Sequence, residues 1–437
     1  MLKPSPAFAH LTAVTDEGAM KAVFETELSK IWGRPAGLQN FFIPRVFSKG
    51  RGRFLIQYRF STLEKSGPRQ WIFFGRVLSA EEILPAFVQR PNAFFVPGIQ
   101  LIVPVFPFDP KLKILPKFFQ SESSSTILGG LSQIQNLNGT ARITRVEILG
   151  YRLERRSLLS LVIQEKNRII SIVAKLVRPE KAAGIFTALR ELENTGFNQQ
   201  TDDQIGVPHP IAHSLEGIVW LEKIDEPSLH DLTGTDAFVS ACQAAGRTLN
   251  KLHRAVLKNL SLYSVEEEWK RLKEMILETA QIYPELADQL TNTFSLLNRD
   301  VPVLRKEEMT PVHRDFYDKQ LLVGPKRVTL IDTDTLALGD PALDVGNFLA
   351  HLVLRAGQHP EAKQTMRDAH RLFTEEYRVA TNWADAETFW KRVGWWETAT
   401  LLRLACLYSL RPRWKELAPF LLEEAQKRIS APGKKNA

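Results

Sequence analysis

Two carboxylates and an amide lie close together in the last third of the 437-residue chain, in an order that suits phosphoryl transfer. Asp315 precedes the amide of Gln320, and Asp332 follows a short predicted hairpin. Phosphoryl transfer needs a carboxylate that orients the attacking hydroxyl and accepts its proton, and hard oxygen ligands for Mg²⁺. Because the hairpin would fold Asp332 back beside the loop of Asp315, both carboxylates could face one metal–phosphate cluster.

Three short motifs in this part of the chain resemble those of the aminoglycoside phosphotransferase and choline kinase family. In order they are His313-Arg314-Asp315-x₄-Gln320, Ile331-Asp332 and Gly339-Asp340-Pro341-x₂-Asp344. The resemblance implies that Asp315 is the catalytic base and that Gln320 and Asp332 are Mg²⁺ ligands. It also implies that Asp340 and Asp344 support the catalytic loop, and that the fold is the bilobal fold of protein kinases.

Two positions depart from the family pattern. Arg314 stands where the family usually has glycine, and Gln320 stands where it usually has asparagine. Glutamine keeps the amide oxygen but adds a methylene, so the geometry at a metal must differ. Maltokinase-like sugar kinases, a branch with an extra N-terminal cap, are similar in having glutamine there, which favours a sugar-like substrate. We expect His313, the other catalytic-loop candidate, to hold the backbone by hydrogen bonds rather than to transfer protons.

The nucleotide phosphates need a cation from the small lobe. Lys175 lies near the end of the predicted strand Ile169–Leu176, in the place of the family's strand lysine, which contacts the α- and β-phosphates. Its expected partner is Glu191, sixteen residues further on in the next predicted helix, with Glu193 as an alternative. The other interpretation of Lys175 is a strand-end lysine without a role.

Two further segments are expected to contact ATP. The predicted strand Gly217–Ile224 would form the hinge between the lobes, where the backbones of Glu222 and Ile224 meet the adenine edge. Gly150–Ser157 is the candidate phosphate-binding turn, but it is not glycine-rich, and the chain has no GxxxxGK phosphate loop. The two adjacent arginines of this turn could reach phosphates, or could belong to a solvated basic turn.

In the family that these motifs resemble, the phosphate acceptor binds between the catalytic loop and the C-terminal helices. Aromatic rings stack on sugars, and charged side chains bind hydroxyl or amino groups. The candidate residues in this region are Tyr317, Asp318, Trp396, Glu397 and Arg403. The alternative for Trp396, as for its neighbour Trp395, is a place in the core of an amphipathic helix.

Patterns of strands and helices predict an α+β chain in three parts. Residues 1–125 would form an N-terminal α+β cap, residues 126–224 a small β-rich nucleotide-binding lobe, and residues 225–437 a mainly helical lobe with the catalytic loop and substrate site. The first two parts resemble each other, since both run from an Arg-Val pair (45–46 and 145–146) through a basic turn into two strands. We interpret the cap as a duplicated or mimicked small-lobe unit.

The formal net charge of +8 lies entirely in the cap region, where residues 1–120 contain 16 Lys and Arg against 8 Asp and Glu. A basic surface can attract phosphate, nucleic acid or a membrane. Because the charges are scattered, a solvated surface is the simpler interpretation, and nucleic acid is not an expected partner. No apolar run reaches eighteen residues and no secretory signal precedes the cap, so we expect no membrane segment. The two isolated cysteines fit a reducing cytoplasm.

Together these features predict an ATP- and Mg²⁺-dependent small-molecule kinase that moves the γ-phosphate to a hydroxyl of a sugar, aminosugar or amino alcohol. A protein kinase is the second enzyme hypothesis, but the segment Gly339–Pro341 replaces the Asp-Phe-Gly of protein kinases and argues against it. The alternative from another class is a non-catalytic nucleotide-binding scaffold, a pseudokinase, that docks through its basic cap. Gln320 and the glycine-poor turn favour that alternative, whereas the intact Asp315, Asp332 and Lys175 weigh against it.

Overall fold

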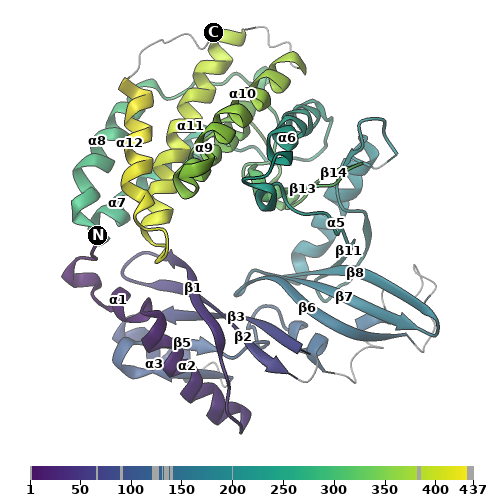
Figure 1. Cartoon of the computed structure of the whole chain (residues 1–437), viewed down its shortest axis with the longest axis vertical. Coiled ribbons are helices and arrows are strands. Elements are labelled where there is room, and N and C mark those ends of the chain that lie inside the picture. Colours follow the sequence, from purple (N-terminus) through teal and green to yellow (C-terminus); the bar gives the residue numbers. More distant parts are fainter. Residues whose placement is uncertain are drawn as a thin grey trace.

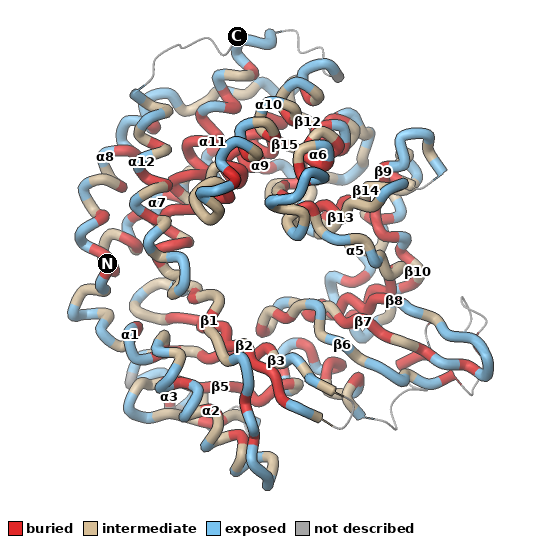
Figure 2. Tube along the Cα trace, in the orientation of Figure 1, coloured by how far each residue is buried: buried red, intermediate tan, exposed pale blue. Residues whose placement is uncertain are grey.

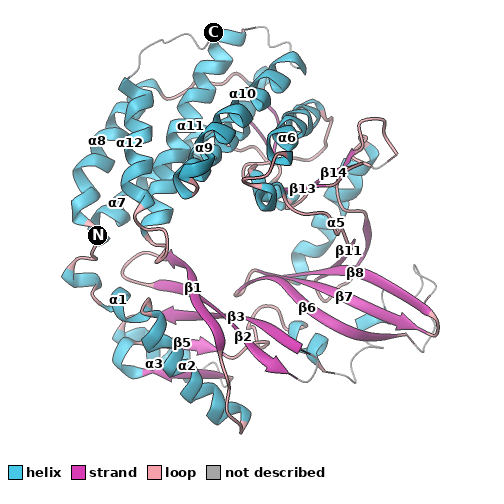
Figure 3. Ribbon diagram, in the orientation of Figure 1, coloured by secondary structure: helices cyan, strands magenta, loops and turns pink. Residues whose placement is uncertain are grey.

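The computed structural model describes residues 2–430 apart from 65–66, 89–91, 121–126, 130, 132–136, 138–140, 199 and 381–384. Its three parts follow one another around a ring (Figure 1). A cap of helices and one sheet comes first, a small β-rich lobe second and a helical lobe third (Figure 3). The predicted α+β class, with two kinase-like lobes and an extra N-terminal cap, is confirmed. The expected boundary at 125/126 lies outside the described residues.

In the cap, helices pack on a five-stranded antiparallel sheet. The helices are α1 (His10–Val14), α2 (Glu17–Trp32) and α3 (Ala80–Val88), and the strands are β1 (Gln39–Ser48), β2 (Phe54–Glu64), β3 (Gly67–Val77), β4 (Ala93–Val96) and β5 (Leu101–Pro104). The strand order is β1-β2-β3-β5-β4. Asp16 caps α2 by accepting a hydrogen bond from the Ala19 amide at 2.8 Å. Phe24 of α2 is fully buried among aromatic rings of the sheet, including Phe73 and Tyr58.

The small lobe contains a second five-stranded antiparallel sheet. Its strands are β6 (Arg142–Arg152), β7 (Arg156–Glu165), β8 (Arg168–Val177), β10 (Pro210–His213) and β11 (Ile218–Glu222), in the order β10-β11-β8-β7-β6. Helix α5 (Pro179–Asn194) follows β8, with proline in its first turn, where no backbone donor is needed. Lys175 lies on the central strand β8, opposite Leu158 of β7 and Val219 of β11. The sheet therefore fixes this lysine from both sides.

The helical lobe contains long helices and two small sheets. The helices are α6 (Ala237–Arg254), α7 (Val265–Ile282), α8 (Ala287–Leu297), α9 (Pro341–Gln358), α10 (Lys363–Ala380), α11 (Ala386–Ser409) and α12 (Leu417–Ser430). One sheet pairs β12 (Thr310–Val312) with β15 (Ala337–Gly339), and the other joins β13 (Leu321–Val323), β14 (Val328–Leu330) and β9 (Ile205–Gly206). The predicted hairpin is thus confirmed as β13–β14.

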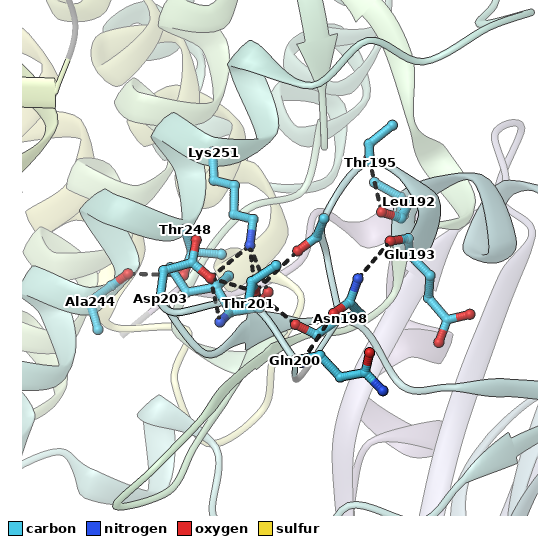
Figure 4. Close-up of polar contacts among 12 residues, drawn as sticks. Leu192, Glu193, Thr195, Asn198, Gln200, Thr201, Asp203, Ala244, Thr248 and Lys251 are labelled. Carbon is cyan, nitrogen blue, oxygen red and sulfur yellow. Dashed lines mark hydrogen bonds and ion pairs between the residues drawn. The ribbon is translucent and has the colours of Figure 1, made fainter.

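A lysine of the helical lobe holds the segment that joins α5 to β9. Lys251 of α6 places its Nζ 2.8 Å from Asp203 Oδ1 and 2.9 Å from the Ile205 carbonyl oxygen (Figure 4). Ile205 in turn pairs with Val328 of β14 in the three-stranded sheet. This contact therefore connects the small lobe to the hairpin that leads to Asp332.

The cap touches both lobes, which closes the ring around the centre (Figure 2). Toward the helical lobe, the Ser5 amide donates to the Ile282 carbonyl at 2.8 Å, and Arg413 pairs with Glu17 at 3.1 Å. Toward the small lobe, Arg76 of β3 pairs with Glu154 at 2.6 Å. None of the described helices combines the length and the apolar character that crossing a bilayer requires.

Candidate active site

A buried carboxylate shapes the loop that carries Asp315. Asp344, at the start of α9, accepts hydrogen bonds from the backbone amides of His313 at 2.6 Å and Arg314 at 2.7 Å. Arg314 has a φ of +72°, in the left-handed region that favours glycine, which explains why the family usually has glycine there. Its guanidinium lies 3.6 Å from the centre of the Tyr263 ring. This stacking and the two amide contacts hold a backbone conformation that is unfavourable for arginine.

A second aspartate fixes the helix that carries Asp344. Asp340 caps α9 by accepting from the Ala342 amide at 3.0 Å, and it accepts from the Trp396 indole at 2.8 Å. Burial raises the pKa of Asp340 despite the neighbouring Arg392. The two aspartates thus link the catalytic loop, α9 and α11 in one buried network.

The hairpin β13–β14 brings the metal-ligand candidates beside the loop. The His313 ring contacts the Ile331 carbonyl oxygen through Nε2 at 3.0 Å, and the Ile331 amide donates to the Gln320 carbonyl at 2.9 Å. Asp332 follows with a φ of +60°. His313 therefore supports the backbone between Gln320 and Asp332, as expected from the sequence.

Two cationic side chains of the small lobe form ion pairs with the carboxylates that follow the hairpin. Lys175 is buried and places its Nζ 2.5 Å from Asp334 Oδ1 and 3.8 Å from Asp332. Arg156, at the start of β7, donates to both oxygens of Asp332, one of them at 2.8 Å. Burial opposes ionisation of Asp332, but Arg156 and Lys175 outweigh it and hold the pKa of this carboxyl below its usual range. Asp332 is therefore ionised at neutral pH.

Asp315 has a different electrostatic environment. Burial raises the pKa of its carboxyl above the usual value, and Asp332 adds to this effect, whereas Arg403 and His313 oppose it. Asp315 lines a cavity of about 1040 Å³ together with Asp332 and Asp334. A raised pKa makes Asp315 a better proton acceptor than an ordinary aspartate, and the cavity gives a substrate access to it.

A second cavity, of about 360 Å³, lies between the lobes and has a largely apolar wall. Lys175, Gln320 and Asp332 form its polar end, and Glu222 and Ile224 of the hinge line it as well. The apolar side chains that line it include Leu149, Val173, Leu189, Leu221, Leu322 and Ile331 of the two lobes, and the cap contributes Phe47 and Phe74 with Arg45, Gln57 and Arg59. The cavity thus combines apolar side chains with charged groups, as a nucleotide requires.

The expected pair of Lys175 and Glu191 is not formed. Glu191 accepts a hydrogen bond from the backbone amide of Lys258, and Glu193 pairs with His209 at 2.7 Å. The face of α5 that reaches the cavity presents Leu189 instead. Glu191 and Glu193 thus have partners outside β8, and Asp334 pairs with the lysine instead.

Three of the residues expected to bind the acceptor belong to the core. Asp318 forms a buried bidentate pair with Arg355, at 2.6 and 2.9 Å, which holds the pKa of this aspartate far below its usual range. Trp396 is 2% exposed, and Glu397 pairs with Arg428 at 2.8 Å. The structure therefore does not bring these three residues to the wall of either cavity: Trp396 and Glu397 are enclosed where α9 packs on α11, and Asp318 is enclosed with Arg355.

The other two acceptor candidates stay close to Asp315. Tyr317 stacks on His351, with 4.4 Å between the ring centres, and the charge of Asp315 contributes to its raised pKa, after burial. Arg403 donates to Asn347 at 2.6 Å and lowers the pKa of Asp315. Asn347 also donates to the carbonyl of Phe316. Arg403 is therefore held at the catalytic loop through α9.

Two members of the site were not found by sequence reasoning. Asp334 was overlooked, although it lies two residues after Asp332 and is the partner of Lys175. Arg156 was seen only as part of a basic turn, yet it contacts Asp332 directly. The repeated Asp-Thr after Ile331 was the available signal for Asp334.

The comparison with protein families decides the membership of the chain. The model of the phosphotransferase enzyme family, APH, matches residues 160–392, more than half of the chain. The chain belongs to this family. The predicted aminoglycoside phosphotransferase and choline kinase relationship is thereby confirmed, while the resemblance to the maltokinase-like branch stays a prediction. The cap lies outside the matched residues. No curated protein matches this chain.

Solved structures of similar proteins have low sequence identity. Spectinomycin phosphotransferase APH(9)-Ia, in complex with ADP and spectinomycin, is 11% identical, covers 71% of this chain and 95% of its own, and has a TM-score of 0.47. A choline/ethanolamine kinase family protein from Mesorhizobium loti is 14% identical, with coverages of 70% and 95% and a TM-score of 0.45. Choline kinase from Cryptosporidium parvum is 13% identical, with coverages of 69% and 94% and a TM-score of 0.48.

Proposed function

We propose that this chain is a small-molecule kinase that transfers the γ-phosphoryl group of ATP to a hydroxyl group of its acceptor. The observation that carries the proposal is the common cavity wall formed by Asp315, Asp332 and Asp334, with Lys175 paired to Asp334. Membership of the phosphotransferase family supports the same reaction class. The ADP bound to the spectinomycin enzyme supports a nucleotide in the cavity between the lobes.

In this proposal Asp315 acts as the catalytic base. The acceptor hydroxyl oxygen attacks the γ-phosphorus, its proton passes to Asp315, and the bond to the bridging oxygen breaks with ADP as the leaving group. Asp340 and Asp344 act as positioning residues, since they fix the loop and α9 through buried hydrogen bonds. Glu222 and Ile224 would meet the adenine through their backbone atoms.

The oxygens near the hairpin suit Mg²⁺. Asp332 and Gln320 line the same cavity, and Asp334 is adjacent to them. The described residues include no group of three His, Cys, Asp or Glu side chains placed to hold a metal, and Mg²⁺ in kinases usually takes only one or two carboxylates and completes its shell with phosphates and water. When bound, Mg²⁺ would neutralise charge on the phosphates of ATP. Arg156 pairs with Asp332 in this structure, and it could contact those phosphates once Mg²⁺ takes its place at Asp332.

The proposal is tested by Mg²⁺-dependent ADP release with a panel of sugars, aminosugars and amino alcohols. We expect turnover with at least one acceptor, and a loss of about 10³-fold or more in Asp315→Asn, because the base is removed while the shape is kept. Arg299→Gln, which changes an exposed residue next to Asp300 after α8, is a control that should keep full activity. Full turnover by Asp315→Asn would exclude this aspartate as the base.

A binding measurement addresses the metal separately. Calorimetry should show that Asp332→Asn lowers the affinity for Mg·ATP at least about tenfold, whereas Gln320→Asn retains it, because asparagine keeps the amide oxygen. Unchanged Mg·ATP affinity in Asp332→Asn would show that Asp332 is not a ligand. Mg·ATP binding without turnover of any acceptor would favour the non-catalytic scaffold.

A further inference from the structure

The larger cavity is shared between the catalytic loop and the cap. Asp315, Asp332 and Asp334 form one wall, and the cap contributes the end of β3 and the turn between β1 and β2 to another. The β6–β7 turn and the start of α5 complete the lining. An acceptor that reaches Asp315 through this cavity would therefore touch the cap as well as the two lobes.

Basic side chains dominate the lining of this cavity. Its basic residues are Lys49, Arg53, Arg76, Lys111, Arg152, Arg155, Arg156, Arg178 and Lys181, against the acidic residues Glu154, Glu180, Asp315, Asp332 and Asp334. Most of the acidic groups already have a cation, since Glu154 pairs with Arg76 and Glu180 pairs with Arg178. The cavity therefore keeps an excess of positive charge beside the base.

Several of these cations have no carboxylate partner. Within the part of the chain that the structure describes, no carboxylate lies within 4.0 Å of the cationic atoms of Lys49, Lys111, Arg152 or Arg155. The Nε of Arg152 is buried and has no hydrogen-bond partner among the described residues. A ligand does not reach this buried nitrogen directly, but the cavity wall carries cationic groups without a carboxylate partner, and an anion bound in the cavity would neutralise them.

The basic groups also repel one another. Burial lowers the pKa of Lys49, and the charges of Arg155, Arg152 and Arg76 lower it further. The pKa of Arg152 falls to about 10, because of burial and then because of Arg155 and Arg156. An anion placed between these groups would relieve this repulsion.

The nucleotide does not account for Lys49 and Lys111 of the cap. Lys175 and Arg156 already lie at the metal-ligand candidates, where the phosphates of ATP would bind in the proposed function. Lys49 and Lys111 of the cap line the larger cavity alone, whereas Arg45 and Arg59 of the cap line the smaller one and Arg152 lines both. The side chains of Lys49 and Lys111 are thus available to the acceptor.

We propose that the acceptor of this kinase carries an anionic group, a phosphate ester or a carboxylate, which Lys49 and Lys111 of the cap bind together with Arg152 and Arg155 while the hydroxyl of the same molecule faces Asp315. This inference rests on the proposed function and names its substrate class. The basic charge of the cap then serves recognition, and the cap completes the acceptor site.

Matched acceptors test the substrate class. ADP release with Mg·ATP is measured for sets that differ only in charge, such as glucose, glucose 6-phosphate and glucuronate, or glycerol and glycerol 3-phosphate. We expect the anionic members to have at least about tenfold higher kcat/KM than their neutral parents, because a charge-assisted contact contributes about that factor. Comparing kcat/KM for the phosphate ester with kcat/KM for the carboxylate shows which of the two anionic groups the site prefers. Equal or better turnover of the neutral parents would overturn the proposal.

Inorganic phosphate tests the site independently of turnover. Calorimetry with inorganic phosphate in the presence of Mg·AMP-PNP should show binding to the wild type and at least about tenfold weaker binding to the double variant Lys49→Gln and Lys111→Gln. The matched control is Lys21→Gln with Lys30→Gln, which removes the same charge from the exposed face of α2. If the wild type does not bind phosphate, or if the cavity variant binds it as tightly as the wild type, the proposed anion site is overturned.

The two proposals fail in different ways. If the kinase proposal is wrong, Mg²⁺-dependent ADP release is absent with every acceptor, but phosphate binding still depends on Lys49 and Lys111. If only the acceptor class is wrong, ADP release occurs with neutral acceptors and the cavity variant keeps the KM of the wild type. In the supported case the cavity variant raises the acceptor KM and leaves the KM for ATP within about twofold.

Discussion

The sheet of the cap and the sheet of the small lobe have the same topology. In each, three consecutive antiparallel strands form a meander, a helix follows the third strand, and a hairpin returns so that the last strand pairs with the third. The cap reads β1-β2-β3-β5-β4, and the small lobe reads β6-β7-β8-β11-β10. The interpretation of the cap as a small-lobe-like unit, based on the two Arg-Val pairs, agrees with this strand order.

The register of the two meanders makes their residues comparable. The third strand ends at Val77 in the cap, opposite Phe54, and at Val177 in the small lobe, opposite Arg156. Two residues before these ends stand Gly75 and Lys175. The small lobe therefore has the lysine that we propose to contact the phosphates where the cap has a glycine.

The helices after the third strands differ as well. Helix α5 has 16 residues, whereas α3 has 9 and contains Pro85, which removes a backbone donor. The small lobe uses its sheet to hold Lys175 against Asp334, and the cap uses its sheet to hold basic side chains over the cavity. One strand order thus carries two different sets of side chains, because the order fixes where the strands lie and leaves the side chains free to differ.

The largest expected effects are those of substitutions at the matching positions Lys175 of β8 and Gly75 of β3. Lys175→Met should lower kcat/KM by about 10²–10³-fold, because the phosphates lose a fixed cation. Gly75→Ala should instead destabilise the fold by about 1–3 kcal/mol, because overpacking distorts the core. A Cβ there would lie 2.6 Å from Leu101 and 3.0 Å from Tyr58. Steady-state kinetics and urea unfolding measure the two effects.

An inactive Gly75→Ala protein with the stability of the wild type would contradict this contrast. It would mean that the third strand of the cap takes part in catalysis in its own right. Gly129→Ala serves as a control, since an added Cβ meets nothing within 4 Å at that glycine.

A smaller but clear effect is expected where the cap meets the small lobe. Asp109 is buried and accepts from the Tyr151 hydroxyl at 2.9 Å and from the Glu154 amide at 2.7 Å, as well as from two amides of its own loop. Asp109→Ala leaves these donors without a partner, so we expect a loss of about 2–4 kcal/mol of unfolding free energy. Because the β6–β7 turn loosens, the KM for ATP should rise several-fold.

The measurements for this variant are thermal unfolding and the KM for ATP, with Asp300→Ala as an exposed control. Lower stability with an unchanged KM for ATP would show that the cap supports the fold without ordering the turn.

The pH dependence of the rate tests the base and its neighbours. The base must be ionised, so kcat/KM falls as the pH drops through the pKa of Asp315, which lies above its ordinary value of 3.8. Arg403→Gln removes the strongest cation that opposes this rise. The acid limb of the profile should therefore move to higher pH, with a several-fold lower rate on the limb itself. A shift to lower pH would contradict the assignment.

The smallest effect is expected at Glu191. Its carboxylate accepts from the Lys258 amide and does not reach Lys175, so Glu191→Gln should keep kcat/KM within about twofold and lose roughly 0.5–1 kcal/mol of stability. Asp334→Asn is the matched comparison, because Asp334 pairs with Lys175. Kinetics that rank the two variants in the opposite order would restore Glu191 as the partner of the lysine.

Much of the site could be predicted from sequence because it is local. Asp315, Gln320 and Asp332 lie within eighteen residues, and a single hairpin brings them together. The strand that carries Lys175 was predicted as Ile169–Leu176 and lies within β8. Helix α9 was not foreseen, although Asp340 and Pro341 are typical of a helix start.

The sequence by itself determined the order of the chemistry: base, metal-ligand candidates and supporting aspartates along one segment, and a basic cap before them. Only the tertiary structure decided which groups meet. Glu191 of α5 contacts the Lys258 amide and not Lys175, whose partner is Asp334. The close packing of α9 on α11 enclosed Trp396 and Glu397 in the core. Such contacts depend on how whole helices and sheets orient against each other, and residue spacing along the chain does not contain that information.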